Sequence, residues 1–239
     1  MSKKNKTIIT ICFILLFIIN SNPIHINAAS NKSNSEKVIY LTFDDGPGGK
    51  ITEETLDILK QEKVHATFFL IGNQVSGQES LVKRIHKDGH SIGLHSMTHN
   101  KNILYSSNTA FLKEMIDEEN LLKDIIGYSP KILRFPFGCN NNSYCLTEKM
   151  VDLLHENGYK IYDWTADTTD GANPNISPNV YVKNAISDSD TIFLLMHCGF
   201  TNKTSPKALP EIIKYYKQKG YKFKTISYDT EEVYHFKKR

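Results

Sequence analysis

Short apolar segments that alternate with longer amphipathic segments constrain the fold of this chain more than any other feature. Seven apolar segments have the length and composition of strands: Val38–Phe43, Ala66–Ile71, Ser91–Leu94, Ile132–Phe135, Lys160–Trp164, Thr191–His197 and Lys222–Ile226. The amphipathic segments predict six helices, at about Thr52–Gln61, Gln78–Lys87, Asn108–Ile126, Thr147–Glu156, Pro178–Ser187 and Pro206–Lys219. This alternation indicates a parallel α/β fold, and both a barrel and an open doubly wound sheet fit it.

Several of the predicted helices have residues at their ends that favour starting or stopping a helix. Thr52 can cap a helix whose first turn carries two Glu residues, which suit its positive end. Asn108 opens the longest helix and Gly127 closes it. Three further helices are followed by glycine: Gly89, Gly158 and Gly220.

The first 29 residues have the three parts of a signal peptide. Three lysines precede an apolar core, Ile8–Ile19, and Ala28-Ala29 offers a cleavage site of small residues. The core has 12 residues, whereas a comfortable membrane span needs about 20, so an uncleaved N-terminal anchor is the alternative. Residues 30–36 have the composition of a polar linker, and residues 37–239 suffice for one domain. We expect a protein that is secreted or associated with the cell wall or cell surface.

The charge balance gives no indication of nucleic-acid binding. The chain has 29 Lys and Arg residues against 26 Asp and Glu residues, a formal net charge of +3. Residues 1–29 contain three Lys and no acidic residue, so the chain that follows them is formally neutral. Nucleic-acid binding calls for a basic patch or stripe. We therefore expect no nucleic-acid partner, and membrane contact only through an uncleaved N-terminal segment.

Three cysteines follow the predicted signal peptide: Cys139, Cys145 and Cys198. An odd number in an exported chain leaves at least one cysteine unpaired or paired between molecules. Cys139 and Cys145 flank a loop of five residues and can form a local disulfide. Three cysteines in so long a chain do not make a disulfide scaffold.

Residues with catalytic or ligand chemistry follow five of the predicted strands. They are Asp44-Asp45, His95, Arg134, Asp167 with Asp170, and His197. The carboxyl ends of parallel strands meet at one edge of the sheet, where such folds build their sites. We therefore expect these side chains to lie close together.

The adjacent carboxylates of Asp44 and Asp45 follow the first predicted strand and precede a Gly-Pro turn. Neighbouring residues of a strand point in opposite directions. At a strand end, one carboxylate can therefore bind a metal ion while the other accepts a proton. A polar surface turn is the alternative, because Asp and Gly both favour turns.

His95 and His99 are four residues apart, and on a helical turn this spacing places both imidazoles on one face. The spacing suits two ligands of one metal ion and also occurs in His-Glu-x-x-His metalloproteases. Ser96 occupies the Glu position, which removes the general base of that class. With Asp45, the pair forms an Asp-His-His set that leaves positions open for water and substrate. Two unrelated surface histidines are the alternative.

Two further residues have the chemistry to support such a site. Arg134 stays protonated and can hold a carboxylate ionised and oriented, or form an ordinary surface salt bridge. His197 ends a strongly apolar strand and can act as a general acid, or be a hydrogen-bonded core histidine. Asp170 can orient a histidine, Asp167 competes for that role, and loop capping is the alternative for both.

Five motifs in this order resemble the NodB-homology polysaccharide deacetylases, also called carbohydrate esterase family four. They are Thr42-Phe43-Asp44-Asp45-Gly46-Pro47, His95-Ser96-x-x-His99, Arg134-Phe135-Pro136-Phe137-Gly138, the segment 167–170, and Leu195-Met196-His197. The resemblance covers about residues 38–226. It implies a distorted (β/α) barrel of about seven parallel strands and metal-dependent removal of acetyl groups from N-acetylated sugars.

The resemblance also implies the ligands of the metal ion. It assigns Asp45, His95 and His99 to one divalent ion, with zinc the usual expectation and cobalt or another divalent metal as alternatives. The expected partner is an N-acetylated glycan. Export and the resemblance together favour peptidoglycan, while chitin-like oligomers, exopolysaccharide and O-acetylated xylan are alternatives.

The same resemblance implies catalytic roles for the remaining motif residues. Asp44 would be the general base, held by Arg134. His197 would be the general acid, paired with Asp170. On the substrate and oxyanion side it implies the backbone N–H of Phe137 together with Leu195.

Two departures from the family pattern bear on substrate choice more than on the reaction. Gly171 follows Asp170 where the family commonly has Trp, and Arg-Phe-Pro-Phe-Gly replaces the common Arg-Pro-Pro-Tyr-Gly. Both changes touch the substrate-side walls of the expected site. We expect a monomeric enzyme, while a carbohydrate-binding pseudoenzyme and an amidase or esterase with a small non-sugar substrate are the rival classes.

Overall fold

The computed structural model describes residues 36–237, so the predicted signal peptide and residues 30–35 of the predicted linker lie outside the described residues. The strands are β1 (Val38–Gly46), β2 (Thr67–Leu70), β3 (Ser91–Leu94), β4 (Ile132–Leu133), β5 (Lys160–Ile161), β6 (Ala166–Asp167), β7 (Thr191–His197) and β8 (Lys222–Lys224). The helices are α1 (Lys50–Glu62), α2 (Glu79–Lys87), α3 (Lys101–Leu104), α4 (Asn108–Ile126), α5 (Glu148–Glu156), α6 (Pro178–Asn184) and α7 (Ser205–Gln218), with a short 3-10 helix at Gly72–Gln74.

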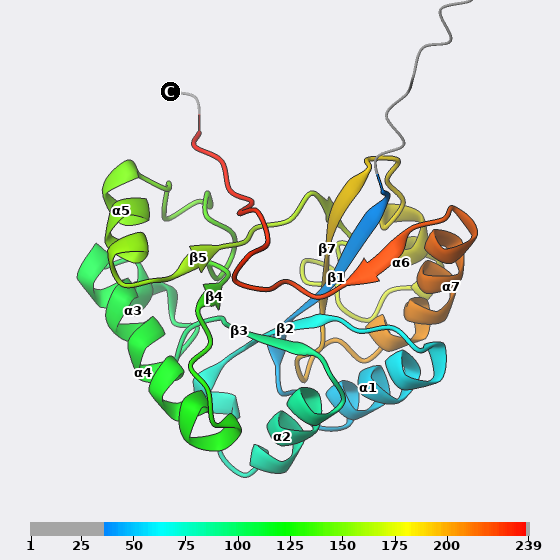
Figure 1. Ribbon diagram of the computed structural model, residues 1–239, viewed down its shortest axis with the longest axis horizontal. Coiled ribbons are helices and arrows are strands. Elements are labelled where there is room, and N and C mark those ends of the chain that lie inside the picture. The colour runs from blue at the N-terminus through cyan, green and yellow to red at the C-terminus, as the bar shows by residue number, and fades with distance from the viewer. Residues whose placement is uncertain (1–35, 238–239) are drawn as a thin grey trace, which may run out of the picture. The chain divides into compact units, whose positions relative to one another are not determined.

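The strands form one parallel sheet that curls into a half-barrel (Figure 1). Its order is β5-β4-β3-β2-β1-β7-β6, and β8 pairs with the first residues of β1. From β1 the chain adds β2 to β5 outward on one side, while β7 and β6 extend the other side. This path of seven parallel strands confirms the expected distorted (β/α) barrel.

Strand β1 lies in the middle of the sheet and is buried on both faces, with Thr42 and Asp44 inaccessible on the face opposite the apolar one. Ile39, Leu41 and Phe43 are almost completely inaccessible to solvent. Strand β1 pairs with β7 without interruption, from Val38 opposite Thr191 to Asp44 opposite His197. The predicted general base and general acid therefore end neighbouring strands at the same edge of the sheet.

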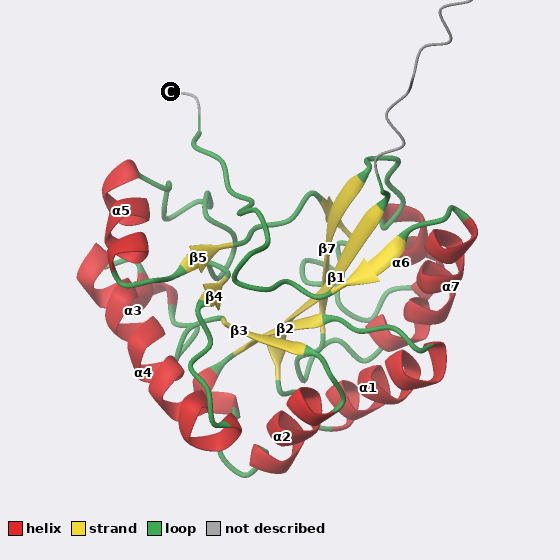
Figure 2. Cartoon of the chain, viewed as in Figure 1, coloured by secondary structure: helices red, strands yellow, loops and turns green. Residues whose placement is uncertain are grey.

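The helices lie around the outside of the strands (Figures 1 and 2). The longest, α4, has the predicted bounds and buries Phe111, Met115 and Leu122. Its N-cap is Ser107, whose hydroxyl accepts a hydrogen bond from the backbone N–H of Ala110 at 3.0 Å. At its other end Gly127 has a φ of 83°, the left-handed conformation that favours glycine and ends helices.

The prediction that Thr52 caps a helix is wrong. Helix α1 begins earlier, at Lys50, with Gly49 as its N-cap. The Thr52 hydroxyl accepts a hydrogen bond from the backbone N–H of Gly48 at 2.8 Å and donates one to the carbonyl of Cys198 at 2.9 Å. Thr52 thus joins the loops that follow β1 and β7 instead of starting a helix.

The strand predicted at Lys160–Trp164 is shorter in the structure. Strand β5 ends at Ile161, and after a crossing segment the chain forms β6 at the opposite end of the sheet. In this crossing segment, the guanidinium of Arg134 donates hydrogen bonds to the backbone carbonyls of Tyr162 and Asp163, both at 2.9 Å. These carbonyls are therefore engaged by a side chain at the point where strand β5 stops.

The three described cysteines are free, so the structure does not contain the Cys139–Cys145 disulfide that the sequence allowed. Cys139 is buried and its thiol contacts the carboxylate of Asp163 at 2.7 Å, whereas Cys145 is exposed. Cys198 is buried after β7. The loop between Cys139 and Cys145 is held instead by backbone pairing of Asn140 with Cys145.

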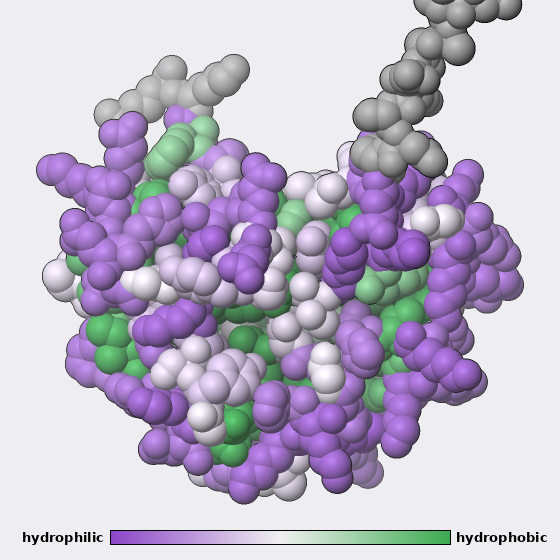
Figure 3. Space-filling view, in the orientation of Figure 1, coloured by the Kyte–Doolittle hydropathy of each residue, from purple (hydrophilic) through white to green (hydrophobic). Residues whose placement is uncertain are grey.

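After β8 the C-terminal segment returns across the side of the sheet where β4 and β5 lie (Figure 1). Val233 pairs with Tyr162, and its carbonyl accepts a hydrogen bond from the N–H of Asp163 at 2.6 Å. The face in Figure 3 is mostly hydrophilic, with apolar side chains visible in recesses between polar ones. Within residues 36–237, every helix is too short or too polar to cross a membrane.

Candidate active site and metal centre

The predicted site residues converge on one cavity of 340 Å³. Twelve residues line it: Asp44, Asp45, His95, His99, Phe137, Gly138, Trp164, Asp167, Gly171, Ala172, Leu195 and His197. Arg134 and Asp170 lie behind this wall, where they contact Asp44 and His197 respectively. Every residue that the sequence motifs singled out therefore lines the cavity or contacts a residue that does.

Asp45, His95 and His99 present three donor atoms to one point. Oδ1 of Asp45 lies 3.5 Å from Nε2 of His95 and 3.4 Å from Nε2 of His99. This carboxylate oxygen is buried and has no hydrogen-bond partner, which is costly unless something else satisfies it. Two imidazole nitrogens and a carboxylate oxygen are a common ligand set for a divalent ion such as zinc, so the residues fit the metal ion that the motifs imply.

The hydrogen bonds around these three residues favour binding of a cation. Nδ1 of His95 lies 2.9 Å from the carbonyl of Arg134, so it carries the ring proton and leaves Nε2 free to coordinate. Burial opposes ionisation of Asp45, but the nearby histidines, His95 foremost, hold its pKa well below the usual range. Burial, with the charge of His95, lowers the pKa of His99 to about 4. At neutral pH the carboxylate is ionised and the His99 imidazole is neutral, as metal ligands must be.

The expectation that His95 and His99 share one face of a helical turn is wrong. The segment after β3 is an irregular loop, in which Ser96 has a φ of 79° and His99 a φ of 52°. The Ser96 hydroxyl accepts a hydrogen bond from the backbone N–H of His99 at 2.9 Å and closes this loop. The two histidines converge through left-handed backbone conformations that non-glycine residues seldom adopt.

Such strained conformations gather around the cavity. Asp45, Phe137 and Thr169 also have a positive φ, of 64°, 66° and 65°. Non-glycine residues in this region cost of order 1 to 3 kcal/mol each and persist where the surrounding structure fixes them. Their clustering indicates that the end of β1 and the loops after β3, β4 and β6 are shaped by the site.

Asp44 has surroundings unlike those of its neighbour Asp45. Its Oδ1 accepts a hydrogen bond from Nη1 of Arg134 at 2.8 Å, and both side chains are buried. Arg134 is fixed in turn by Thr42, whose hydroxyl accepts from the same Nη1 at 2.7 Å. The other oxygen, Oδ2, lies 3.7 Å from Nε2 of His95 and faces the ligand set. Asp44 is thus an oriented carboxylate with one oxygen directed toward the proposed metal centre.

His197 is oriented by Asp170, which decides between the two candidate carboxylates. Nδ1 of His197 lies 2.8 Å from Oδ1 of Asp170, and Oδ2 accepts the backbone N–H of His197 at 2.9 Å. Asp167 instead accepts the backbone N–H of Thr169 at 2.6 Å. Burial lowers the pKa of His197, but the hydrogen bond and charge of Asp170 outweigh it and raise this pKa to about 9. His197 is therefore protonated at neutral pH, as a proton donor must be.

Gly171 lies directly against the imidazole of His197. A Cβ atom at this position would be 2.4 Å from Cε1 and 2.7 Å from Nε2 of the ring, closer than real contacts allow. The glycine that departs from the family pattern therefore leaves room for the histidine in its present position.

Phe137 and Trp164 form apolar parts of the cavity wall. The Phe137 ring is about half exposed and its centroid lies 4.6 Å from that of His99. Trp164 packs so closely on Gly138 that a Cβ there would be 2.9 Å from the indole. The sequence motifs did not single out Trp164 as a site residue, and its position between β5 and β6 carries no motif of its own.

Sequence reasoning also missed the carboxylate that supports the histidine loop. Glu114 of α4 accepts hydrogen bonds from the backbone N–H and the hydroxyl of Thr98, both at 2.8 Å. A Glu on a helix is usually solvated, so only its burial at this position identifies it. Glu114 thereby fixes the residue that precedes His99.

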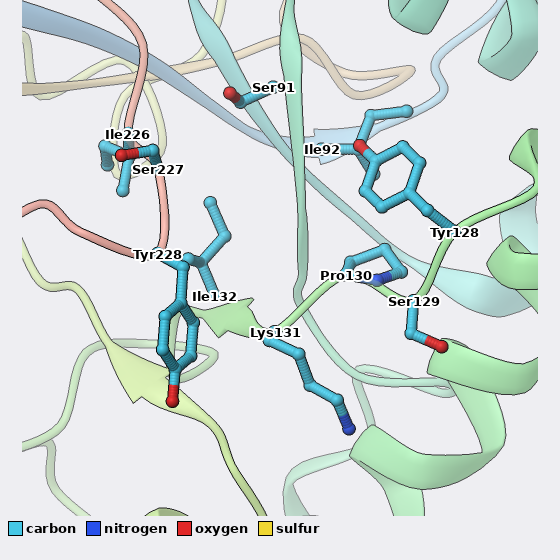
Figure 4. Close-up of a pocket in the computed structure, with 10 residues that line it drawn as sticks. All are labelled: Ser91, Ile92, Tyr128, Ser129, Pro130, Lys131, Ile132, Ile226, Ser227 and Tyr228. Carbon is cyan, nitrogen blue, oxygen red and sulfur yellow. The ribbon is translucent and has the colours of Figure 1, made fainter.

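A second cavity of 270 Å³ lies at the opposite edge of the sheet (Figure 4). Ser91 and Ile132, the first residues of β3 and β4, line it, together with Tyr128, Lys131 and Tyr228. Its walls contain neither carboxylates nor imidazoles. This cavity therefore lacks the chemistry of the first one, and the candidate active site is at the carboxyl ends of the strands.

The chain belongs to the polysaccharide deacetylase family, whose model matches residues 31–162. It is 43% identical over 196 residues to a peptidoglycan-N-acetylglucosamine deacetylase of Bacillus cereus, covering 78% of this chain and 68% of that protein. It is 36% identical over 200 residues to the peptidoglycan-N-acetylmuramic acid deacetylase PdaC of Bacillus subtilis, covering 83% of this chain and 40% of PdaC. The crystal structure of the polysaccharide deacetylase Bc1974 from Bacillus cereus superposes with a TM-score of 0.75 at 39% identity, covering 82% of this chain and 95% of that one.

Proposed function

We propose that this protein removes N-acetyl groups from the amino sugars of peptidoglycan outside the cell, at a centre that holds one divalent metal ion. Family membership supports deacetylation of a polysaccharide, and the named substrates of its relatives support peptidoglycan. The observation that carries the proposal is the contrast between two adjacent carboxylates. Asp44 is held by Arg134, while Asp45 directs an unpartnered oxygen at two imidazole nitrogens.

Asp45, His95 and His99 would hold the ion, and zinc suits a site of two imidazoles and a carboxylate. A bound divalent ion supplies a Lewis acid that polarises a carbonyl and lowers the pKa of water. Cobalt and other divalent metals fit the same donor set. The three side chains leave the cavity side open for water and substrate.

The other side chains divide the proton transfers between them. Asp44, oriented by Arg134, accepts the proton of the attacking water. The backbone N–H of Phe137 donates a hydrogen bond to the acetamide oxygen as negative charge develops on it. His197, held protonated by Asp170, delivers its proton to the leaving amine. The products are acetate and a free amino sugar.

The cavity wall provides contacts for the sugar and its acetyl group. Leu195 and Trp164 line the cavity, and Trp164 packs on Gly138. Apolar and aromatic walls with a few placed polar groups are typical of sites that bind small groups. Residues 1–29 would direct export to the cell wall, with membrane contact only if they remain uncleaved, and we propose that the enzyme acts as a monomer.

The test is release of acetate from peptidoglycan, chitin oligomers and acetylated xylan, with and without a chelator. We expect the highest rate on peptidoglycan, loss of the rate with the chelator, and recovery with zinc. Release from acetylated xylan alone would make the protein an O-acetyl esterase. An absence of release from every glycan, with metal shown to be bound, would make it a carbohydrate-binding pseudoenzyme.

The isosteric pair Asp44→Asn and Asp45→Asn tests the division of labour between the two carboxylates. Metal content measured after dialysis should fall in Asp45→Asn and stay unchanged in Asp44→Asn. Acetate release should be lost in both variants. Equal loss of metal in the two variants would contradict the assignment.

A further inference from the structure

Three side chains outside the active site place different metal-binding atoms close together. Cys139 lies in the loop after β4, Asp163 in the crossing segment after β5, and His235 in the C-terminal segment. The thiol, a carboxylate oxygen and an imidazole nitrogen of these residues all lie within 4.8 Å of one another. Cys139 and Asp163 are buried, while His235 is exposed.

The backbone brings His235 to this position and holds it there. The His235 carbonyl accepts a hydrogen bond from Nδ2 of Asn140 at 2.6 Å. Two residues earlier, the Val233 carbonyl accepts the backbone N–H of Asp163 at 2.6 Å. The C-terminal segment therefore lies against both of the other chain segments through hydrogen bonds that do not involve its imidazole.

The surroundings of the Cys139 sulfur suit a thiolate. Nδ2 of Asn140 donates a hydrogen bond to the sulfur at 3.2 Å, the kind of contact that stabilises sulfur ligands in metal sites. Without an ion, burial and the neighbouring Asp163 carboxylate raise the pKa of the thiol to about 12, so it stays protonated. A divalent ion would displace that proton, because only the thiolate coordinates.

Charge balance favours an ion over two buried acidic groups alone. One thiolate, one carboxylate and one neutral imidazole carry two negative charges, which a divalent ion neutralises. Burial raises the pKa of the Asp163 carboxyl, although the hydrogen bonds of Cys139 and the charge of Arg134 lower it in part. An uncompensated buried charge is costly, whereas a charge paired with a metal ion is tolerated.

We propose that Cys139, Asp163 and His235 form a second site for a divalent, zinc-like ion that fastens the C-terminal segment to the loop containing Phe137. A thiolate, an imidazole and a carboxylate are all zinc ligands, and a water molecule can complete the tetrahedron. The sulfur and the carboxylate oxygen are 2.7 Å apart, whereas two such ligands of one tetrahedral zinc ion lie roughly 3.5 Å apart. Binding therefore requires the exposed His235 ring to close in while the other two side chains separate slightly.

An ion at this second site would also hold the loop that contains Phe137. Cys139 follows Phe137 and Gly138, and its own backbone N–H already donates to the Asp163 carboxylate at 3.2 Å. An ion on the same carboxylate would tie the loop to the C-terminal segment through a coordinate bond. The second site is independent of the proposed deacetylation, so the two can fail separately.

The experiment counts metal ions in the full-length chain and identifies their ligands. Metal-depleted, reduced protein is titrated with zinc by calorimetry and with cobalt by absorption spectroscopy. We expect two zinc equivalents for the unaltered protein and one for each of His99→Ala and His235→Ala. His235 is exposed, so His235→Ala should fold normally.

Cobalt bound to a thiolate has a charge-transfer absorption in the near ultraviolet, which cobalt held only by oxygen and nitrogen lacks. We expect this absorption in the His99→Ala variant and its loss when Cys139→Ser is added, while the matched change of the exposed Cys145→Ser leaves it unaltered. A zinc stoichiometry that His235→Ala does not lower, or a thiolate absorption that survives Cys139→Ser, would overturn the proposal. A Cys139–Cys145 disulfide found in the exported protein would also overturn it.

Discussion

The contact between Arg134 and Asp44 allows a prediction about folding that does not depend on the reaction. Arg134 is fully buried and donates four hydrogen bonds, to Asp44, Thr42 and the carbonyls of Tyr162 and Asp163. Arg134→Met would leave the buried Asp44 charge without its partner, which costs about 3–5 kcal/mol. The two carbonyls would also lose their donor, at about 1–3 kcal/mol each unless water reaches them. We therefore expect Arg134→Met to lower the free energy of unfolding by at least about 4 kcal/mol.

A double-mutant cycle separates the charge contribution from the carbonyl contribution. In the Asp44→Asn background there is no carboxylate charge to leave unpaired, so Arg134→Met should cost about 2–3 kcal/mol less than in the native background. The assay is urea denaturation of the metal-depleted protein, followed by fluorescence and circular dichroism. Equal costs of Arg134→Met in the two backgrounds would refute the reasoning, because they would show that Arg134 acts on the backbone carbonyls alone.

Three further predictions follow from the groups around the cavity. The folded pKa of His197, about 9, is above the unfolded value of about 6.5. Protonated His197 should therefore contribute about 3 kcal/mol to the free energy of unfolding below pH 6.5, and this contribution should disappear as the pH rises through 9. In Asp170→Asn, the free energies of unfolding measured at pH 6 and pH 10 should no longer differ by this amount. Gly171→Ala should push the His197 ring by roughly 1 Å, because a Cβ would lie 2.4 Å from Cε1 of the ring. This displacement should lower the rate of acetate release about 100-fold without changing the metal content. An unchanged rate would show that the ring has room to move. Glu114→Gln should weaken zinc binding about 10- to 100-fold, because it loosens the loop that contains Thr98 and His99. Competition with a chelator measures this affinity. The control variant Thr98→Ser keeps both hydrogen-bond donors and should bind zinc as the native protein does.

Local sequence signals were reliable where a single segment determined its own structure. The bounds of α4, β3 and β7 agree with the prediction, because each has a clear apolar pattern and, for α4, a residue at its end that stops a helix. The predictions failed where a distant side chain competed for the backbone. Strand β5 stops early beside the Arg134 side chain, and Thr52 bonds to the loop after β7 instead of capping α1.

The sequence by itself determined the parallel α/β architecture, since strand and helix periodicities depend only on neighbouring residues. It also placed Asp44, Asp45, His95, Arg134 and His197 at strand ends, because a strand's end is marked by local turn residues.

Only the tertiary structure decided which partner each of these side chains has. Arg134 contacts Asp44 across 90 positions of sequence, and Asp170 rather than Asp167 contacts His197. The histidine pair converges through left-handed backbone conformations and not through a helical turn. The grouping of Cys139, Asp163 and His235 likewise depends on the path of the C-terminal segment, which no local pattern specifies. Contacts between residues far apart in sequence depend on the packing of the whole sheet, and that packing cannot be read from any one segment.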